Sequence, residues 1–237
     1  MSNLLVSDFD RTFYLNDSDI EKNKIWVDKF IDKGGIFVVA TGRSYKDFYD
    51  KLNIYKFNYN YVILNHGATI LSNSGEILYN ICIPKEIVSQ IKINLDLLNC
   101  VDYFCCSKID SRVDFLHENI TKINVKYKND KIAREKVKLI NDKFFKYVNA
   151  YYVNNFMIEI ISSKANKAKA IKILIEHLSN LIYPNVYVIG DGYSDIVMIK
   201  EFNGYCMKDS VIELKKIAKK EFASVSELIE EINNEQI

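Results

Sequence analysis

Two aspartates near the N-terminus have the spacing of chemically active residues. Asp8 and Asp10 come directly after Leu4-Leu5-Val6, an apolar run typical of a strand buried on both faces. Side chains in a strand repeat every second residue, so both carboxylates are expected to point the same way. Two anions side by side at the mouth of a sheet need a cation or a shifted proton. The plain alternative is a loop in which Asp10 or Thr12 caps a helix.

Two later apolar runs also end in polar groups. The run at 36–40 ends at Thr41-Gly42, and the run at 186–189 ends in a turn that holds Asp191 and Asp195. Binding sites in an open α/β sheet form beyond the carboxyl ends of the strands. If these strands are central neighbours, the three polar groups meet in one crevice. Several carboxylates there favour Mg²⁺, a hard cation that prefers oxygen ligands.

A lysine and a threonine complete this predicted crevice. Lys167 begins a predicted helix that leads into the third cluster, and it supplies a fixed positive charge. Lys164 and Lys169 lie close by, and lysines on a helix are usually just solvated, so the spacing alone leaves the choice among the three open. Thr41, with Gly42 and the N-terminus of the next helix, offers a hydroxyl and free N–H groups to a phosphoryl group.

The order of elements predicts an α/β core made of two separate parts of the chain. Strands and helices alternate at both ends, which is typical of a parallel sheet with right-handed crossovers. We expect a helix over 20–33, capped by Ser18 or Asp19 and stopped at Gly34. The other predicted core elements are strands 36–40, 61–64, 186–189 and 204–207, helices ending near 52 and spanning 167–181, and a hairpin over 68–83.

The pattern changes between residues 84 and 162. Helices near 85–98 and 133–145 and strands near 147–153 and 156–161 predict an inserted α+β unit. The predicted domains are therefore a discontinuous core, 1–83 with 163–237, and an insert over 84–162.

Composition excludes several classes of protein. The chain of 237 residues has a net charge of +1, which gives no reason to expect a nucleic-acid partner. Its five cysteines are odd in number and form no C-x-x-C pair, so we expect neither a disulfide framework nor a zinc site. The same cysteine usage predicts a protein of the reducing cytoplasm. No apolar run has the length of a membrane span or resembles a signal peptide. The oligomeric state stays open.

Four motifs in this order resemble the haloacid dehalogenase-like (HAD) superfamily of phosphatases, and within it the Cof-like group with a large C2-type cap. The resemblance covers the core and is weak over the insert. The turn Asn65-His66-Gly67-Ala68 also looks like the one after the family's third strand. The matching motifs are Asp8-Phe9-Asp10-Arg11-Thr12, Thr41-Gly42-Arg43, Lys167-Ala168-Lys169-Ala170 and Gly190-Asp191-Gly192-Tyr193-Ser194-Asp195.

The resemblance implies a Mg²⁺-dependent phosphomonoester hydrolase that acts on small phosphorylated metabolites, sugar phosphates first. Asp8 would be the nucleophile that forms an aspartyl-phosphate, and Asp10 the general acid and base. Thr41, Gly42 and Lys167 would bind the phosphoryl group. The ion would be held by Asp8, the backbone carbonyl of Asp10 and Asp191, and the insert would close over the crevice as a cap.

Two residues depart from the family pattern. Arg11 stands where glycine is usual, and Ser194 where asparagine is usual. Asp195 is expected to orient the site rather than to bind the metal. Arg43 either contributes to the site or only anchors a loop. Asn65 is a further candidate, and the three histidines (His66, His117, His177) form no ligand spacing and are expected to be structural or surface residues.

Three other functions fit parts of the pattern. A sugar phosphomutase would share the fold and a similar cap. A catalytically weak relative that only binds ligands would be consistent with Arg11 and Ser194. A receiver-like signalling domain also pairs acidic residues with a lysine, but it would need an aspartate where this chain has Asn65, and it would lack the insert.

Overall fold

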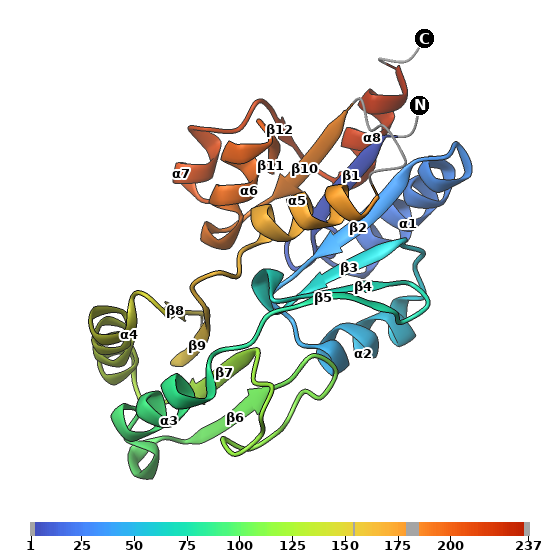
Figure 1. Ribbon diagram of the computed structural model, residues 1–237. Helices are drawn as coiled ribbons and strands as arrows, with labels where there is room; N and C mark the ends of the chain where they lie inside the picture. Colours follow the sequence, from blue (N-terminus) through green and yellow to red (C-terminus); the bar gives the residue numbers. More distant parts are fainter. Residues whose placement is uncertain (1–2, 154, 179–184, 235–237) are drawn as a thin grey trace.

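The computed structural model describes residues 3–153, 155–178 and 185–234, and it contains two sheets (Figure 1). The larger sheet has eight strands. In spatial order they are β12 (Glu221–Phe222), β11 (Tyr205–Met207), β10 (Val186–Gly190), β1 (Leu4–Asp8), β2 (Ile36–Ala40), β3 (Tyr61–Leu64), β4 (Thr69–Ser72) and β5 (Ile77–Asn80).

The strands of this sheet run parallel from β12 to β3, and β4 and β5 add an antiparallel hairpin. The strands predicted at 36–40 and 61–64 and the hairpin within 68–83 are confirmed. β10 and β2 flank β1 on its two sides, as the meeting of the three polar clusters requires.

Helices cover both faces of the larger sheet, which makes it a three-layer, Rossmann-like α/β unit. Successive residues of β1 face opposite layers: Leu5 packs in one buried cluster, and Leu4 and Val6 pack in the other. The first layer contains α1 (Asp17–Asp32), α2 (Tyr45–Tyr55) and α8 (Val225–Asn234). The second contains α5 (Lys167–His177), α6 (Ile196–Glu201) and α7 (Ile212–Lys215).

Helix α1 begins earlier than predicted. Its N-cap is Asn16, whose side-chain oxygen accepts hydrogen bonds from the backbone N–H groups of Ser18 and Asp19. The prediction that Ser18 or Asp19 caps this helix is therefore wrong, and so is the alternative that Asp10 or Thr12 does. Gly34, with φ of +85°, lies just beyond the C-terminal end as predicted.

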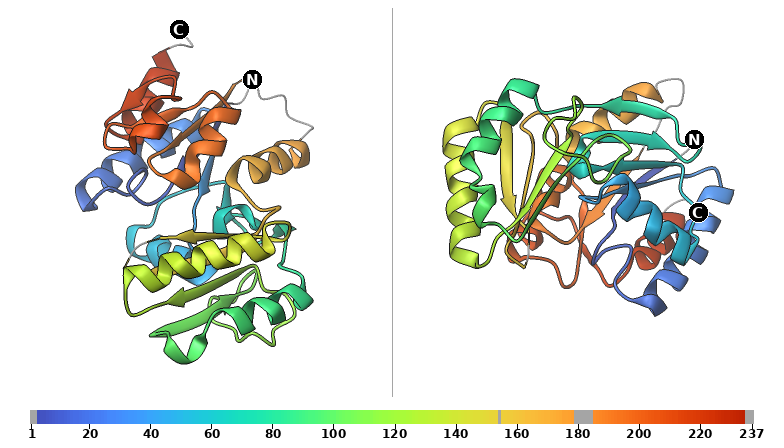
Figure 2. Two further views of the ribbon diagram at one scale, coloured as in Figure 1. Left: turned by 90° about the vertical axis from the view of Figure 1, so that its left-hand side faces the viewer. Right: turned by 90° about the horizontal axis from the view of Figure 1, so that it is seen from below.

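The smaller sheet is antiparallel and belongs to the part of the chain between β5 and α5. In spatial order its strands are β6 (Asp102–Cys106), β7 (Lys122–Lys126), β9 (Met157–Ser162) and β8 (Val148–Tyr152). Apolar side chains of one face, among them Ile123 and Ile160, pack against α3 (Lys85–Asn94) and α4 (Asp130–Phe144). Figure 2 shows these helices on the side of the smaller sheet that is turned away from the larger one.

Two predicted helices end earlier than expected. Helix α3 stops at Asn94 rather than at residue 98, because Asp96 takes a left-handed φ of +54° and a short 3₁₀ turn follows at Leu97–Asn99. Helix α5 stops at His177, and the predicted continuation over 179–181 lies outside the described residues.

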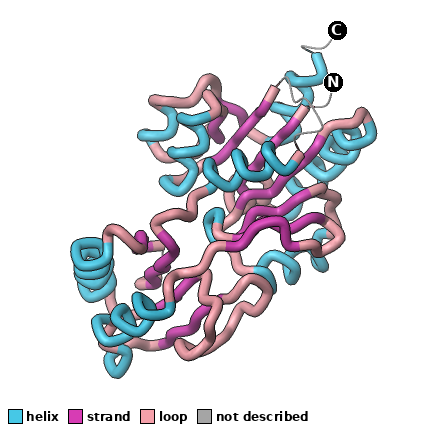
Figure 3. The backbone as a smooth tube through the Cα atoms, viewed as in Figure 1, coloured by secondary structure: helices cyan, strands magenta, loops and turns pink. Residues whose placement is uncertain are grey.

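Two segments join the units, one after β5 and one after β9 (Figure 3). No helix of the described residues is long and apolar enough to cross a membrane.

The face of the smaller sheet that lies opposite α3 and α4 is the more polar one. It lies against the carboxyl edge of the larger sheet, where the two units enclose a pocket of about 580 Å³.

Candidate active site

Three neighbouring strands bring the sequence-predicted residues together. Asp8 ends β1 and pairs in register with Ala40, the last residue of β2, so Thr41 lies at the same edge. Asp191 directly follows β10 on the other side of β1. Asp8, Asp10, Thr41, Gly42, Arg43, Asp191 and Ser194 all line the pocket between the two units.

Lys167 is the buried cation of the site. Its Nζ lies 2.5 Å from Asp8 Oδ1 and 2.6 Å from Asp195 Oδ1, and its side chain is 1% exposed. Although burial opposes a charge on Lys167, the Asp195 and Asp8 carboxylates raise its pKa above the usual value. Asn166 caps α5 through a hydrogen bond from the Lys169 N–H, and this start of the helix places Lys167 inside the site.

Asp195 uses both carboxylate oxygens within the protein. Oδ1 accepts from Lys167, and Oδ2 accepts from the backbone N–H groups of Asp191 and Gly192, each at 3.0 Å. The lack of a Cβ on Gly190 is needed here, because a Cβ would lie 2.5 Å from Asp195 Cγ. Asp195 thus fixes the turn that carries Asp191.

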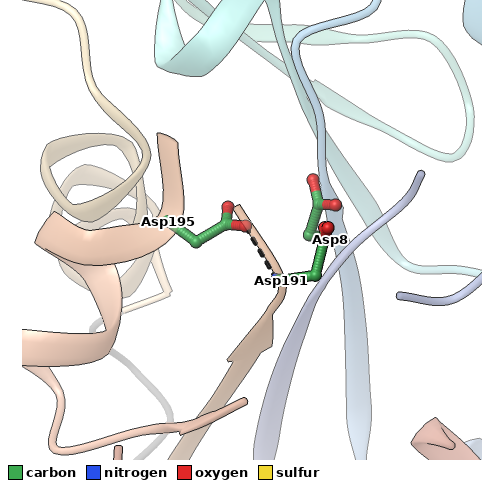
Figure 4. A group of neighbouring side chains, drawn as sticks. All are labelled: Asp8, Asp191 and Asp195. Carbon is green, nitrogen blue, oxygen red and sulfur yellow. Dashed lines mark hydrogen bonds between the residues drawn. The ribbon is translucent and has the colours of Figure 1, made fainter. Parts of the chain in front are cut away.

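Asp8 and Asp191 can each offer an oxygen atom to a metal ion. Asp191 Oδ1 accepts a hydrogen bond from Thr12 at 3.3 Å, and Oδ2 lies 3.4 Å from the Nε of Arg11, whose side chain is 68% exposed. Asp8, Asp191 and Asp195 each offer one oxygen within 4.8 Å of the others, and Figure 4 shows the three side chains, with Asp195 on the turn that leads into α6.

The charge of this cluster fits a hard cation. Burial and the neighbouring Asp195 and Asp191 hold the pKa of Asp8 well above its usual value, although Lys167 opposes the shift. Burial and Asp195 also raise the pKa of Asp191. Three buried carboxylates face one buried lysine, so negative charge is in excess. Oxygen-only ligands with excess negative charge suit Mg²⁺ or a similar divalent ion.

Asp10 lies apart from the buried cluster, on the open side of the pocket. Its carboxylate, 46% exposed, accepts two hydrogen bonds from Arg43, one from Nε at 2.8 Å and one from Nη2 at 2.7 Å. Arg43 therefore does more than anchor a loop, because its planar guanidinium sets the orientation of the Asp10 carboxylate.

The loop after β2 is held by its own side chains and by the turn after β3. Thr41 Oγ1 accepts from the Arg43 N–H at 3.1 Å. Asn65 is fully buried in that turn, where its Nδ2 donates to Thr121 at 3.2 Å. The Asn65 Oδ1 atom is buried without a hydrogen-bond partner among the described residues.

The backbone explains one departure from the family pattern. Arg11 has φ of +63°, a left-handed conformation that glycine adopts at the lowest cost, which accounts for the usual glycine at this position. In this chain the arginine occupies that turn and pairs with Asp191. Ser194 lines the pocket between the two units. Together with Tyr193 it also lines a second, smaller pocket of about 330 Å³.

Three ionisable residues of the pocket were not predicted to belong to the site. Lys122 and Glu159 extend from β7 and β9, and His66, which the sequence predicted to be structural or on the surface, lies in the core turn after β3 and contacts Glu159. They come from three distant segments, so no local spacing links them. The one available signal was the polar residue at alternate positions of the strand 122–126.

Comparison with known proteins identifies the family. Residues 5–113 and 103–228 match the family described as haloacid dehalogenase-like hydrolase. An "Uncharacterized protein" of Mycoplasma capricolum subsp. capricolum is 31% identical, with 88% of this chain and 91% of that protein aligned. A "Putative phosphatase" of Buchnera aphidicola is 27% identical over 87% of this chain and 86% of that protein.

Solved structures show the same fold. The crystal structure of a haloacid dehalogenase-like hydrolase from Bacteroides thetaiotaomicron superposes with a TM-score of 0.81 at 19% identity, covering 98% of this chain and all of the other, 100%. The chain belongs to the haloacid dehalogenase-like hydrolases, and it is an enzyme of that family. The fold and family predicted from the motifs are confirmed.

Proposed function

We propose that this enzyme is a phosphomonoester hydrolase that works through an aspartyl-phosphate on Asp8. The observation that carries the proposal is the contact of a buried lysine with the Asp8 carboxylate at the mouth of the sheet. A carboxylate held in this way presents its other oxygen to a substrate in the pocket. The similarity to a protein named "Putative phosphatase" supports the same reaction.

In the first half-reaction, an Asp8 oxygen forms a bond to phosphorus while the bond from phosphorus to the leaving oxygen breaks. Asp10 donates a proton to that leaving oxygen. Lys167, Thr41 and the N–H groups after Gly42 stabilise the charge on the phosphoryl oxygens. In the second half-reaction, Asp10 takes a proton from water and the water oxygen bonds to phosphorus. The bond from phosphorus to the Asp8 oxygen breaks, which regenerates the Asp8 carboxylate and frees orthophosphate.

The Asp8 and Asp191 carboxylates and the backbone carbonyl of Asp10 would hold Mg²⁺. When bound, the ion neutralises the anionic cluster and so allows a phosphate to approach. Asp195 would keep its role as an orienting residue, because Lys167 and two backbone N–H groups occupy its oxygens.

We further propose that residues 84–162 form a cap over a core made of 1–83 and 163–237. The cap face that lines the pocket carries Phe104, Asn124 and Met157 beside its ionic residues. This mixture of polar and apolar groups suits a small phosphorylated metabolite, with sugar phosphates as the first class to examine.

Rapid-quench mass spectrometry tests the mechanism by locating a phosphoryl group on the peptide that spans Asp8. With an activated aryl phosphate and Mg²⁺, the Asp8→Asn variant should show neither label nor turnover. The Asp10→Asn variant should still be labelled and should keep its label longer, because its water lacks a base. Label in Asp8→Asn, or turnover with no covalent species in any variant, would contradict the mechanism. A Lys164→Ala variant, at an exposed residue between β9 and α5, serves as the control.

A further inference from the structure

A second buried ion pair lies on the cap face that meets the core. Lys122 Nζ contacts Glu159 Oε1 at 2.9 Å, and the two side chains are 3% and 13% exposed. The residues sit diagonally on neighbouring strands, since Glu159 is paired with Asn124 and Lys122 with Ile161. Because both belong to the cap, this pair stays together if the cap moves.

Each member of the pair also reaches one backbone or side-chain group of the core. Lys122 Nζ donates to the carbonyl oxygen of Gly42 at 2.7 Å. Glu159 Oε2 lies 2.6 Å from His66 Nε2. These two contacts join the cap to the loops after β2 and β3, and opening of the cap would break both.

The two core groups contact each other closely. A Cβ on residue 42 would lie 2.3 Å from His66 Cε1, so the imidazole rests where only a glycine leaves room. His66 and Asn65 both have left-handed φ values, +57° and +50°. Their backbone N–H groups donate to Thr41 O at 3.0 Å and to Arg43 O at 2.9 Å. The His66 turn thus braces the whole loop that carries Thr41 and Arg43.

Further hydrogen bonds of the cap reach the turn after β3 and the start of α2. Thr121, next to Lys122, accepts from Asn65 at 3.2 Å, and Ser111 accepts from the Lys46 N–H at 2.8 Å. Among the described residues, no hydrogen bond joins the cap to the Asp8–Asp10 turn or to the Asp191–Asp195 turn. The cap therefore contacts the phosphate-binding loop but makes no hydrogen bond to the carboxylate cluster of Asp8, Asp191 and Asp195.

We propose, on the basis of the phosphatase function above, that Lys122 and Glu159 are positioning residues for the phosphate-binding loop. In the closed enzyme they hold the Gly42 carbonyl and the His66 ring. Through those two groups they fix Thr41 against the phosphoryl oxygens and Arg43 against Asp10. The cap thereby completes the site on closing, without touching the reacting atoms.

The test uses the Lys122→Met/Glu159→Leu double variant of the full chain. Removing both charges avoids an unpaired buried ion, a change that proteins often tolerate without loss of stability. Lys122→Arg is the conservative variant, and Lys126→Met, at the other end of the same strand, is the matched control. Two quantities are measured: inhibition of aryl phosphate hydrolysis by orthophosphate, and backbone amide exchange in peptides covering 41–46 and 64–68.

We expect the double variant to need about tenfold more orthophosphate for half inhibition, because a displaced loop binds the anion poorly. Its amides in 41–46 and 64–68 should exchange faster, while those of β1 and β10 stay as in the wild type. Lys122→Arg should recover part of both effects, and Lys126→Met should show neither.

Wild-type orthophosphate affinity together with wild-type exchange in the double variant would overturn the positioning role. Faster exchange throughout the cap with those two loops unchanged would also overturn it, since it would show a merely structural role. These outcomes are distinct from failure of the proposed function, in which the wild-type enzyme itself would neither hydrolyse the aryl phosphate nor bind orthophosphate.

Discussion

Two buried ionic networks face each other across the pocket, and they differ in charge balance. In the core, Asp8, Asp191 and Asp195 surround one buried lysine, and burial together with mutual repulsion raises the pKa of Asp8 and of Asp191. In the cap, Glu159 is the single carboxylate, and it contacts both Lys122 and His66. Although burial alone would raise the pKa of Glu159, these two partners lower it to about 2.

The difference separates the proposed reaction site from an ion pair that acts only through the loops it holds. Among the buried residues, the core network has excess negative charge, so it could bind a further cation, as the proposed metal-dependent reaction needs. The cap network is balanced by protein groups alone and needs no ligand. Burial by itself therefore does not mark the reactive group, whereas an uncompensated charge does.

Of the changes considered, removal of Lys167 should lower the unfolding free energy most. In Lys167→Met the three carboxylates would face one another without a buried cation, and we expect a loss of about 3–5 kcal/mol in unfolding free energy at pH 7 without metal. Asp8 has a raised pKa in the folded state, so its protonated form is favoured at low pH and the repulsion grows as pH rises. The deficit should therefore shrink toward pH 4. Urea unfolding at the two pH values measures it, with the exposed Lys172→Met as control. An equal deficit at both would contradict the repulsion.

The balanced network should lose its stabilising effect in a more acidic range than the core network does. Glu159 has a folded-state pKa of about 2 against its ordinary 4.5, so its contribution is present above pH 4.5 and disappears as pH falls toward 2. The shift corresponds to about 3 kcal/mol, which Glu159→Gln should lose at pH 7. The difference in unfolding free energy between variant and wild type, measured by urea unfolding, should disappear as pH falls toward 2. Glu118→Gln, at an exposed ion pair, should show no gap at any pH.

Gly42→Ala should disturb the contact between the networks. The new methyl group would overlap the His66 ring, and overpacking of this kind costs about 1–3 kcal/mol. In a His66→Ala background the same substitution should cost much less, because the ring is gone. Thermal unfolding of the four proteins gives the coupling. Gly192→Ala, where the nearest atom lies 3.9 Å from the added Cβ, is the control, and additive effects of the two changes would refute the steric account.

The smallest effect on stability is expected for Asp191→Asn. Without metal, removal of one repelling charge should leave the unfolding free energy unchanged or raise it by about 1 kcal/mol at most, since the pKa of Asp191 is raised in the folded state. The stabilisation that Mg²⁺ gives the wild type should be lost. Thermal shifts with Mg²⁺ and with chelator measure both, beside the exposed Asp32→Asn. Full activity in excess chelator would remove the metal from the mechanism.

The sequence by itself was enough for the core and for the residues at its edge. Asp8, Thr41 and Asp191 each follow an apolar run, and parallel strands place their carboxyl ends at one edge, so local patterns sufficed to bring these residues together. The boundaries of α1 and α3 were less accurate. There Asn16 and Asp96 decided the ends of the helices through hydrogen bonding and a left-handed backbone, which apolar periodicity does not report.

Only the tertiary structure decided how the side chains share their charges. Arg43 meets Asp10, and Lys122 meets Gly42, across 33 and 80 positions of the chain. Among the nearby lysines, Lys167 reaches the site because Asn166 caps the helix one residue before it. Such contacts depend on how distant segments pack together, within the core for Arg43 and Lys167 and between cap and core for Lys122, and no spacing within a single strand or helix encodes that.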